Sequence, residues 1–136
     1  LGAPAAKQVG KMMVGTTTEG TAKKSFFEDN GTPFIPGVAV AGKTGSLTGK
    51  RAPAYNYNWF VGFAPADDPQ IAFAVLIANE ADWKIKAHYA GRRLVQVWLE
   101  RRKAIDAQRH AKIQGESLVL PARDENSGAV ISRGPS

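Results

Sequence analysis

Hydrophobic and polar residues follow a strand-like pattern in three segments of the chain. These segments are VAVAGKTGSL at 38–47, YNWFVGFAP at 57–65 and QIAFAVLIAN at 70–79. The second alternates along its length, whereas the third is apolar on both faces, as is typical of a central strand. The turn residues Asp67-Asp68-Pro69 predict a short hairpin between the second and third segments. We therefore expect three consecutive antiparallel strands, with the third at the centre of its sheet.

After the third segment the apolar residues recur at helical spacing, which predicts a long helix through about residue 112. Its apolar face comprises Trp83, Ala87, Ala90, Gly91, Leu94, Val95, Trp98 and Ile105. The basic residues Lys84, Arg92, Arg93 and Arg101 lie largely outside that face. Glycine costs a helix about 1 kcal/mol relative to alanine. Gly91 therefore predicts that the helix backbone approaches a sheet closely at this point.

The order of these elements predicts an α/β fold of the α+β kind, an antiparallel sheet with a long C-terminal helix. A short helix at 3–14 and a turn-rich segment at 28–37 precede the strands. A chain of 136 residues can bury one core. We expect residues 1–112 to form one domain. Residues 113–136 mix Gly, Ser, Pro and charges without periodicity, so we expect a flexible tail there.

The stretch GVAVAGKTGS at 37–46 admits two interpretations of Lys43. Residues 37–44 satisfy the phosphate-loop pattern, which requires a strand that ends in a turn and opens a helix. Residues 38–41 instead resemble the strand itself, and glycines and Pro53 within nine residues of Thr44 prevent a helix from starting. The sequence therefore argues against nucleotide binding.

The second interpretation takes Lys43-Thr44-Gly45 as one wall of a ligand site on a strand. An ammonium and a hydroxyl suit a carboxylate, and glycine lets a ligand approach the backbone. The amide of Ser46 can then point toward the developing oxyanion of an acyl-transfer step.

Composition limits the kinds of site and segment that the chain can contain. The chain has no cysteine, which excludes disulfides and thiolate metal sites. His88 and His110 lack clustered ligands, so we expect surface histidines and no metal. Trp59, Phe60 and Phe63 are expected in the sheet core. No apolar run approaches the roughly 20 residues that cross a bilayer.

The net charge of +6 is concentrated in one segment of the chain. Residues 80–112 hold nine Lys or Arg against four Asp or Glu, a surplus of +5. Such a surplus usually marks a solvated helix face. We therefore expect no nucleic-acid partner, and a basic nucleic-acid-binding domain is the weaker alternative.

Four segments occur in the order found in one known family. They are GTA at 20–22, VAGKTGS at 40–46, NWFVGFAP at 58–65 and DPQIAFAVLIAN at 68–79. With the terminal helix they cover roughly residues 5–105, and together they resemble the C-terminal portion of the transpeptidase domain of penicillin-binding proteins.

This resemblance implies a role for each residue of the Lys-Thr-Gly segment. Lys43 and Thr44 would bind the substrate carboxylate, Gly45 would permit close approach, and the Ser46 amide would supply half of an oxyanion hole. In the family, a serine of a Ser-x-x-Lys motif attacks a D-Ala-D-Ala stem peptide or a β-lactam, assisted by a Ser-x-Asn motif. No serine here has Lys three positions on or Asn two positions on, so the resemblance implies a nucleophile outside this chain.

The resemblance thus predicts part of a peptidoglycan D,D-transpeptidase acting outside the cytoplasmic membrane, without a cofactor. We expect this chain either to pair with the N-terminal portion of the same protein as a second chain or to be an isolated remnant, and to form no acyl-enzyme alone. Carboxypeptidase and β-lactamase activities share these features and stay open. A non-catalytic binding or assembly module of the same fold is the main alternative.

Overall fold

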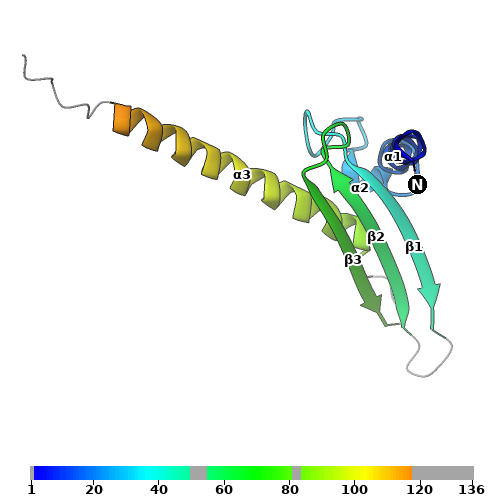
Figure 1. The fold of residues 1–136 in the computed structure, drawn as a ribbon. Helices are drawn as coiled ribbons and strands as arrows, with labels where there is room; N and C mark the ends of the chain where they lie inside the picture. The colour runs from blue at the N-terminus through cyan, green and yellow to red at the C-terminus, as the bar shows by residue number, and fades with distance from the viewer. Residues whose placement is uncertain (1, 50–54, 81–83, 118–136) are drawn as a thin grey trace, which may run out of the picture. The chain divides into compact units, whose positions relative to one another are not determined.

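The computed structural model describes residues 2–49, 55–80 and 84–117 (Figure 1). Its elements are α1 (Ala3–Thr18), α2 (Lys23–Phe26), β1 (Ala41–Thr48), β2 (Asn56–Ala64), β3 (Ile71–Asn79) and α3 (Ala87–Ser117). The chain divides into two compact units, residues 1–100 and 101–136. Helix α3 continues past the expected boundary at 112, and the tail predicted beyond it stays a prediction. Trp83 lies outside the described residues.

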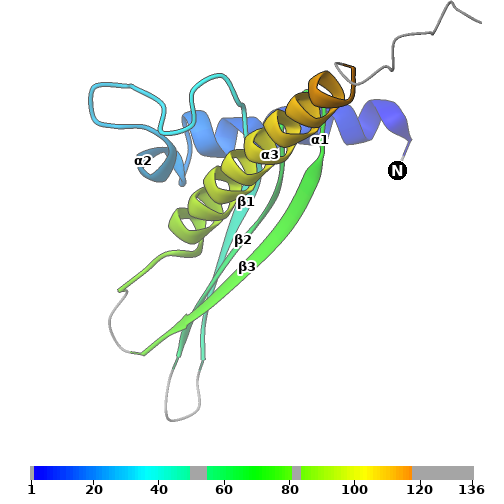
Figure 2. The same cartoon turned by 90° about the vertical axis from the view of Figure 1, so that its left-hand side faces the viewer.

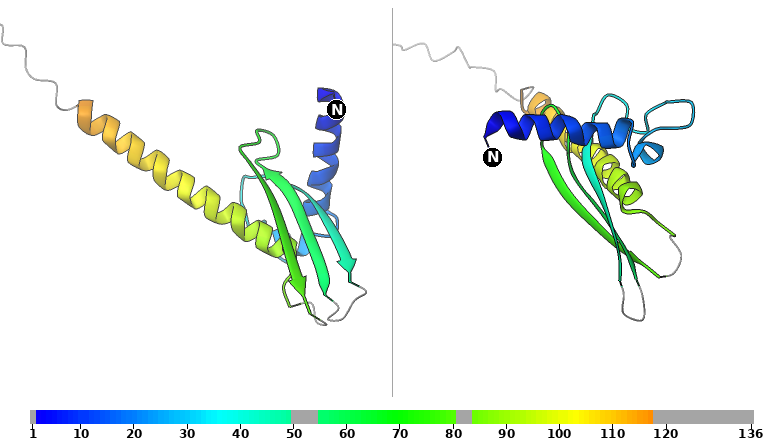
Figure 3. Two further views of the ribbon diagram at one scale, coloured as in Figure 1. Left: turned by 60° about the horizontal axis from the view of Figure 1, so that its bottom comes forward. Right: turned by 90° about the vertical axis from the view of Figure 1, so that its right-hand side faces the viewer.

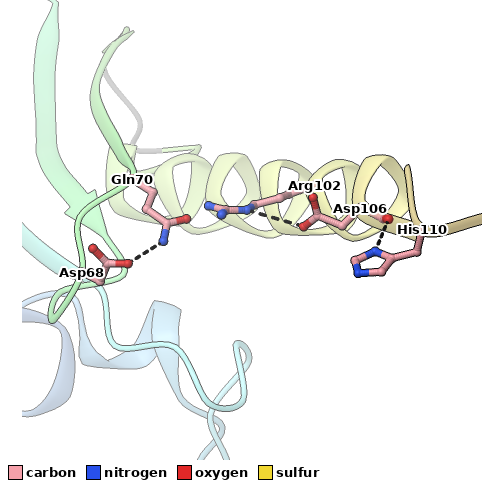
Figure 4. A network of polar contacts seen from close by, with 5 residues as sticks. All are labelled: Asp68, Gln70, Arg102, Asp106 and His110. Carbon is pink, nitrogen blue, oxygen red and sulfur yellow. Dashed lines mark hydrogen bonds and ion pairs between the residues drawn. The ribbon is translucent and has the colours of Figure 1, made fainter. Parts of the chain in front are cut away.

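The three strands form an antiparallel sheet in the order β1-β2-β3, as the sequence predicts. The central strand is β2, so the expectation of a central β3 is wrong for the described sheet. Along β3, half-buried residues alternate with exposed ones. The exposed positions are mostly alanines, whose small side chains made the strand appear apolar on both faces. The predicted hairpin between β2 and β3 is confirmed, and in its connection Gln70 Nε2 donates to Asp68 Oδ2 at 2.7 Å (Figure 4).

The first half of α3 lies across one face of the sheet (Figure 2), where Phe60 is fully buried. The Phe60 ring lies 5.8 Å from Phe26 and 5.7 Å from Phe73, between ring centroids. A Cβ added at Gly91 would lie 2.5 Å from the Phe60 ring. The predicted close approach of the helix at Gly91 is therefore confirmed. Gly42 of β1 is equally constrained, because its Cβ would lie 2.3 Å from the same ring.

The opposite face of the sheet is largely exposed in the described residues. Strand β2 alternates, so Phe60 faces α3 whereas Trp59 and Val61 face away and are 44% and 38% exposed. The expectation that Trp59 belongs to the core is therefore wrong. Phe63 lies on this second face and is half-buried, next to Gly10 of α1.

Helix α1 packs against the beginning of β1 (Figure 3). The buried Thr17 hydroxyl lies 2.7 Å from the Val40 carbonyl oxygen, to which it donates a hydrogen bond. This bond ties the end of α1 to the entry of β1. None of the described helices combines the length and apolar character that a membrane span requires.

Arg92 is buried, at 7% exposure, although the sequence places it outside the apolar face of α3. Its guanidinium carbon lies 4.4 Å from the centroid of Phe34 and 5.0 Å from that of Tyr89. Long arginine side chains can cover aromatic surface in this way. Removal from water lowers the pKa of Arg92.

In the second unit, the α3 residues with described side chains are exposed. Arg102 Nε lies 3.8 Å from Asp106 Oδ2 (Figure 4). His110 Nδ1 lies 2.7 Å from the Asp106 carbonyl oxygen, so this nitrogen carries the proton and donates. His110 is a surface residue, as expected.

Candidate active site

Strand β1 carries the Lys43-Thr44-Gly45-Ser46 segment along the edge of the sheet. Thr44 lies opposite Phe60 and Ser46 opposite Asn58. Because side chains alternate along a strand, the Thr44 and Ser46 hydroxyls project on the face covered by α3. Lys43 projects on the other face, where its Nζ donates to the Thr44 carbonyl oxygen at 2.7 Å. A ligand that contacts both Lys43 and Thr44 must therefore lie at the outer edge of β1.

The pattern of hydrogen bonds between β1 and β2 shows which peptide groups of β1 face this outer edge. The Gly49 amide donates to the Tyr55 carbonyl oxygen at 2.8 Å, in the same register as the rest of the ladder. Hydrogen-bonded and non-hydrogen-bonded pairs alternate along an antiparallel ladder. The backbone N–H and C=O groups of Lys43 and Gly45 consequently form hydrogen bonds with β2, whereas those of Thr44 and Ser46 point away from it. The Ser46 amide thus faces the outer edge of the sheet.

Thr21 approaches the segment from the connection between α1 and α2. Its hydroxyl oxygen lies 2.8 Å from that of Thr44, within hydrogen-bond distance. A Cβ at Gly20 would lie 3.0 Å from the Thr16 backbone, and the neighbouring Ala22 is fully buried. The Gly20 and Ala22 backbone amides also bond to α1, at 2.8 and 3.1 Å. The Gly-Thr-Ala segment is therefore fixed, with its threonine against Thr44.

A pocket of about 380 Å³ opens on the α3 side of β1. It is lined by residues from four parts of the chain: Thr21 before α2, Thr44, Gly45 and Ser46 of β1, Asn58 and Trp59 of β2, and Lys86 and His88 around the start of α3. Lys43 is not part of its lining. Of the predicted site residues, the structure therefore gathers Thr44, Gly45 and Ser46 around this pocket, and leaves Lys43 outside it.

His88 is half-buried in this wall, and the expectation of an ordinary surface histidine is wrong. Its Nδ1 lies 2.7 Å from the Ser25 hydroxyl, and its ring meets Phe60 edge-on at 6.4 Å between centroids. Burial, and secondarily the Lys86 charge, lowers the pKa of His88. The imidazole is thus neutral at neutral pH. Sequence reasoning missed His88 because Ser25 is distant in the chain.

Asn58 is the most buried polar residue of the pocket, at 5% exposure. Its Nδ2 has no hydrogen-bond partner within the part of the chain that the structure describes. The described residues include no cluster of three or more His, Cys, Asp or Glu able to hold a metal ion.

Comparisons with known proteins agree with this architecture. The chain is 44% identical over 50 residues to the peptidoglycan D,D-transpeptidase PbpA of Mycobacterium tuberculosis, a match covering 35% of this chain and 10% of that protein. The corresponding protein of Mycolicibacterium smegmatis is 40% identical over 50 residues, with the same shares covered. The chain therefore matches about a tenth of the length of these curated relatives.

A solved structure, penicillin-binding protein A from M. tuberculosis as an imipenem acyl-enzyme complex, matches with a TM-score of 0.56. The identity is 31%, over 73% of this chain and 20% of that one. This likeness confirms the predicted fold, an antiparallel sheet with a long helix. The model of the penicillin binding protein transpeptidase domain matches residues 3–96, well over half of the sequence. The chain therefore belongs to the family of penicillin-binding protein transpeptidase domains.

Proposed function

We propose that this chain is part of a peptidoglycan D,D-transpeptidase and supplies the Lys-Thr-Gly wall of its active site. The observation that carries this proposal is the outward-facing Ser46 amide beside the Thr44 hydroxyl, on the free edge of β1 in the described sheet. A backbone amide held by a strand is a preorganised donor, which is what the oxyanion of an acyl-transfer step requires.

Each residue of the wall has a distinct task in this proposal. The Ser46 amide stabilises the negative charge that develops on the attacked carbonyl oxygen. The Thr44 hydroxyl binds the substrate carboxylate, and Lys43 adds positive charge across the edge of the strand. Gly45 keeps the edge open: its added Cβ would make only an ordinary contact, 3.5 Å from Trp59. Packing among the described residues therefore does not require glycine at 45, which supports a ligand as the reason for it.

The serine nucleophile in this proposal comes from residues outside this sequence, since no serine here belongs to a Ser-x-x-Lys motif. Ser25 and His88 are in hydrogen-bond contact, as a nucleophile and its base would be. Ser25, however, is only 9% exposed and lies among core residues such as Phe26. We assign this pair a structural role, in which Ser25 holds the His88 ring in place.

The substrate in this proposal is a peptidoglycan stem peptide, and a β-lactam would take its place. The imipenem acyl-enzyme of the structural neighbour supports the second part, since imipenem is a β-lactam. Peptidoglycan lies outside the cytoplasm, so we place the activity there. The remaining portion of the transpeptidase domain is the partner that we expect to complete the site.

Labelling with a fluorescent penicillin tests this function. We expect a longer protein, containing this chain and its upstream portion, to be labelled covalently on a residue outside the present sequence. The 136-residue chain alone should stay unlabelled. Labelling of the chain alone would contradict the external nucleophile. A longer protein that binds but is never labelled would instead be a non-catalytic module.

A further inference from the structure

The hydroxyl of Thr44 is in contact with a second hydroxyl, that of Thr21. The two oxygens lie 2.8 Å apart, although 23 positions separate the residues in the chain. A hydroxyl carries one proton to donate and lone pairs that accept. One of the two threonines therefore donates across this contact and the other accepts. The direction determines whether the Thr44 proton is available to a ligand.

An anion bound by Thr44 fixes the direction of this hydrogen bond. An ionised ligand oxygen only accepts hydrogen bonds, so Thr44 must use its single proton for the ligand. The contact between the threonines is then kept only when Thr21 donates and Thr44 accepts. Hydroxyls that are linked in such a chain polarise one another, which strengthens each bond. Thr21 can thus act on the ligand through Thr44.

Thr21 has a backbone that is held on both sides. The Gly20 amide donates to the Gly15 carbonyl oxygen at 2.8 Å, and the Ala22 amide donates to the Thr16 carbonyl oxygen at 3.1 Å. Ala22 is also fully buried. Rotation about χ1 is itself restricted in a β-branched side chain. The Thr21 hydroxyl is therefore presented from a fixed point at the end of α1.

The strand that carries Thr44 is tied to the same end of α1. Thr17, in the last turn of α1, donates to the Val40 carbonyl oxygen at 2.7 Å in a buried hydrogen bond. Val40 directly precedes β1, and Thr44 is the fourth residue of that strand. This connection is needed because the contact between Thr21 and Thr44 is exposed, where water competes for each hydroxyl. The surrounding backbone keeps the two oxygens within hydrogen-bond distance.

We propose that Thr21 is a positioning residue of the reaction, which donates to Thr44 and so directs the Thr44 proton toward the substrate. This inference rests on the proposed function, in which Thr44 binds the substrate. It makes the Lys-Thr-Gly wall dependent on the Gly-Thr-Ala segment at the end of α1. The property required at position 21 is a hydroxyl donor, which serine shares and valine lacks.

The rate at which penicillin acylates the longer protein, containing this chain and its upstream portion, tests the role of Thr21. Thr21→Val keeps the shape of the side chain and removes the donor. It should lower the second-order rate constant about three- to tenfold, as expected for one hydrogen bond. The loss should appear as a higher penicillin concentration at half-maximal rate. The limiting rate should stay within about twofold of the wild type, because the Ser46 amide is unchanged.

Two further variants separate the hydrogen bond from a general effect on the fold. Thr21→Ser keeps the donor and should restore the rate. Thr18→Val is the matched control, since the Thr18 hydroxyl lies at the same end of α1 but donates to the Val14 carbonyl oxygen, at 3.1 Å. It should change the rate less than about twofold. An unslowed Thr21→Val, no rescue by serine, or equal slowing by Thr18→Val would overturn the inference.

A double substitution shows whether Thr21 acts through Thr44. Thr44→Val alone should slow acylation, and adding Thr21→Val should then slow it no further. Two losses that multiply would mean that Thr21 acts independently of Thr44, which contradicts the proposed role.

NMR of the isotopically labelled 136-residue chain tests the contact without catalysis. Thr21→Val should shift the methyl and backbone amide signals of Thr44, whereas Thr18→Val should leave them in place. No shift of Thr44 would overturn the contact itself. A labelled wild type with an unslowed Thr21→Val refutes the role of Thr21 alone. A longer protein that penicillin never labels refutes the proposed function, and the role of Thr21 in the reaction with it, even where NMR confirms the contact.

Discussion

Replacing Gly91 by alanine should destabilise the protein, although alanine is the better helix former. Gly91 lies within α3, where the Phe60 ring packs directly on its backbone. An added Cβ would lie 2.5 Å from Phe60 Cδ1 and 3.0 Å from Cε1. The ring cannot retreat easily, because Phe60 is fully buried and Gly42 contacts it from β1.

The magnitude follows from two opposing effects. Alanine in place of glycine favours a helix by about 1 kcal/mol. Overpacking a well-packed core costs about 1–3 kcal/mol. We expect a net loss of about 1–2 kcal/mol in the free energy of unfolding. Gly15→Ala is the matched control: Gly15 lies in α1, and its added Cβ meets no atom within 4 Å. This control should gain about 0.5–1 kcal/mol.

Urea denaturation followed by circular dichroism measures both variants against the wild type. The two substitutions should shift the unfolding midpoint in opposite directions at an unchanged slope. If Gly91→Ala stabilised the protein as much as Gly15→Ala, the packing of Phe60 on α3 would be refuted. A second control, Gly115→Ala, lies in α3 itself and has open space at its Cβ.

Three further predictions concern the core, the site and pH. Phe60→Ala should lower the free energy of unfolding in urea by about 3–5 kcal/mol, whereas Trp59→Ala, on the exposed face of the sheet, should lower it by less than half of that. Equal losses would contradict the assignment of Phe60 and Trp59 to opposite faces. Thr21→Val should slow penicillin acylation of the longer protein about three- to tenfold through the lost bond to Thr44, and Thr21→Ser should restore the rate; no slowing, or no rescue by serine, would argue against that bond. Burial, and secondarily the Lys86 charge, lowers the pKa of His88 below its ordinary 6.5. As the pH falls below 6.5, the unfolded state therefore binds more protons than the folded state. The contribution of the neutral His88 to the free energy of unfolding is fully present above pH 6.5 and is lost as the pH falls from there to the folded-state pKa. His88→Gln should reduce this loss between about pH 7.5 and 5.5 in urea unfolding, and an unchanged pH dependence would contradict it.

The order and type of the main elements could be predicted because each depends on local pattern. A strand-like pattern identified β1, alternation identified β2, helical spacing identified α3, and Gly91 indicated the contact of α3 with the sheet. The position of β3 could not be predicted in the same way. Alanines at alternate positions are compatible with a buried or an exposed face, so the pattern alone does not say which face is covered.

The candidate site was predictable only where the chemistry is contiguous in sequence. The Lys-Thr-Gly segment identified Thr44 and Ser46, and strand periodicity could have placed Lys43 on the opposite face. Thr21 and His88 depend on contacts with residues 23 and 63 positions away in the chain. Such contacts are set by tertiary packing, and one sequence does not reveal them. The Gly-Thr-Ala segment was the available indication for Thr21.

The hydrogen-bonding register between β1 and β2 makes the site sensitive to insertions in β1 as well as to the type of each residue. In a strand, the direction of the peptide groups and the direction of the side chain alternate together. A one-residue insertion between Ser46 and Gly49, if pairing continued through it, would turn the Ser46 amide toward β2. The same slip would move the Thr44 hydroxyl to the opposite face, away from Thr21. A single added residue would thus remove both the outward-facing Ser46 amide and the Thr44 hydroxyl from the site, although every residue that forms the site would still be present.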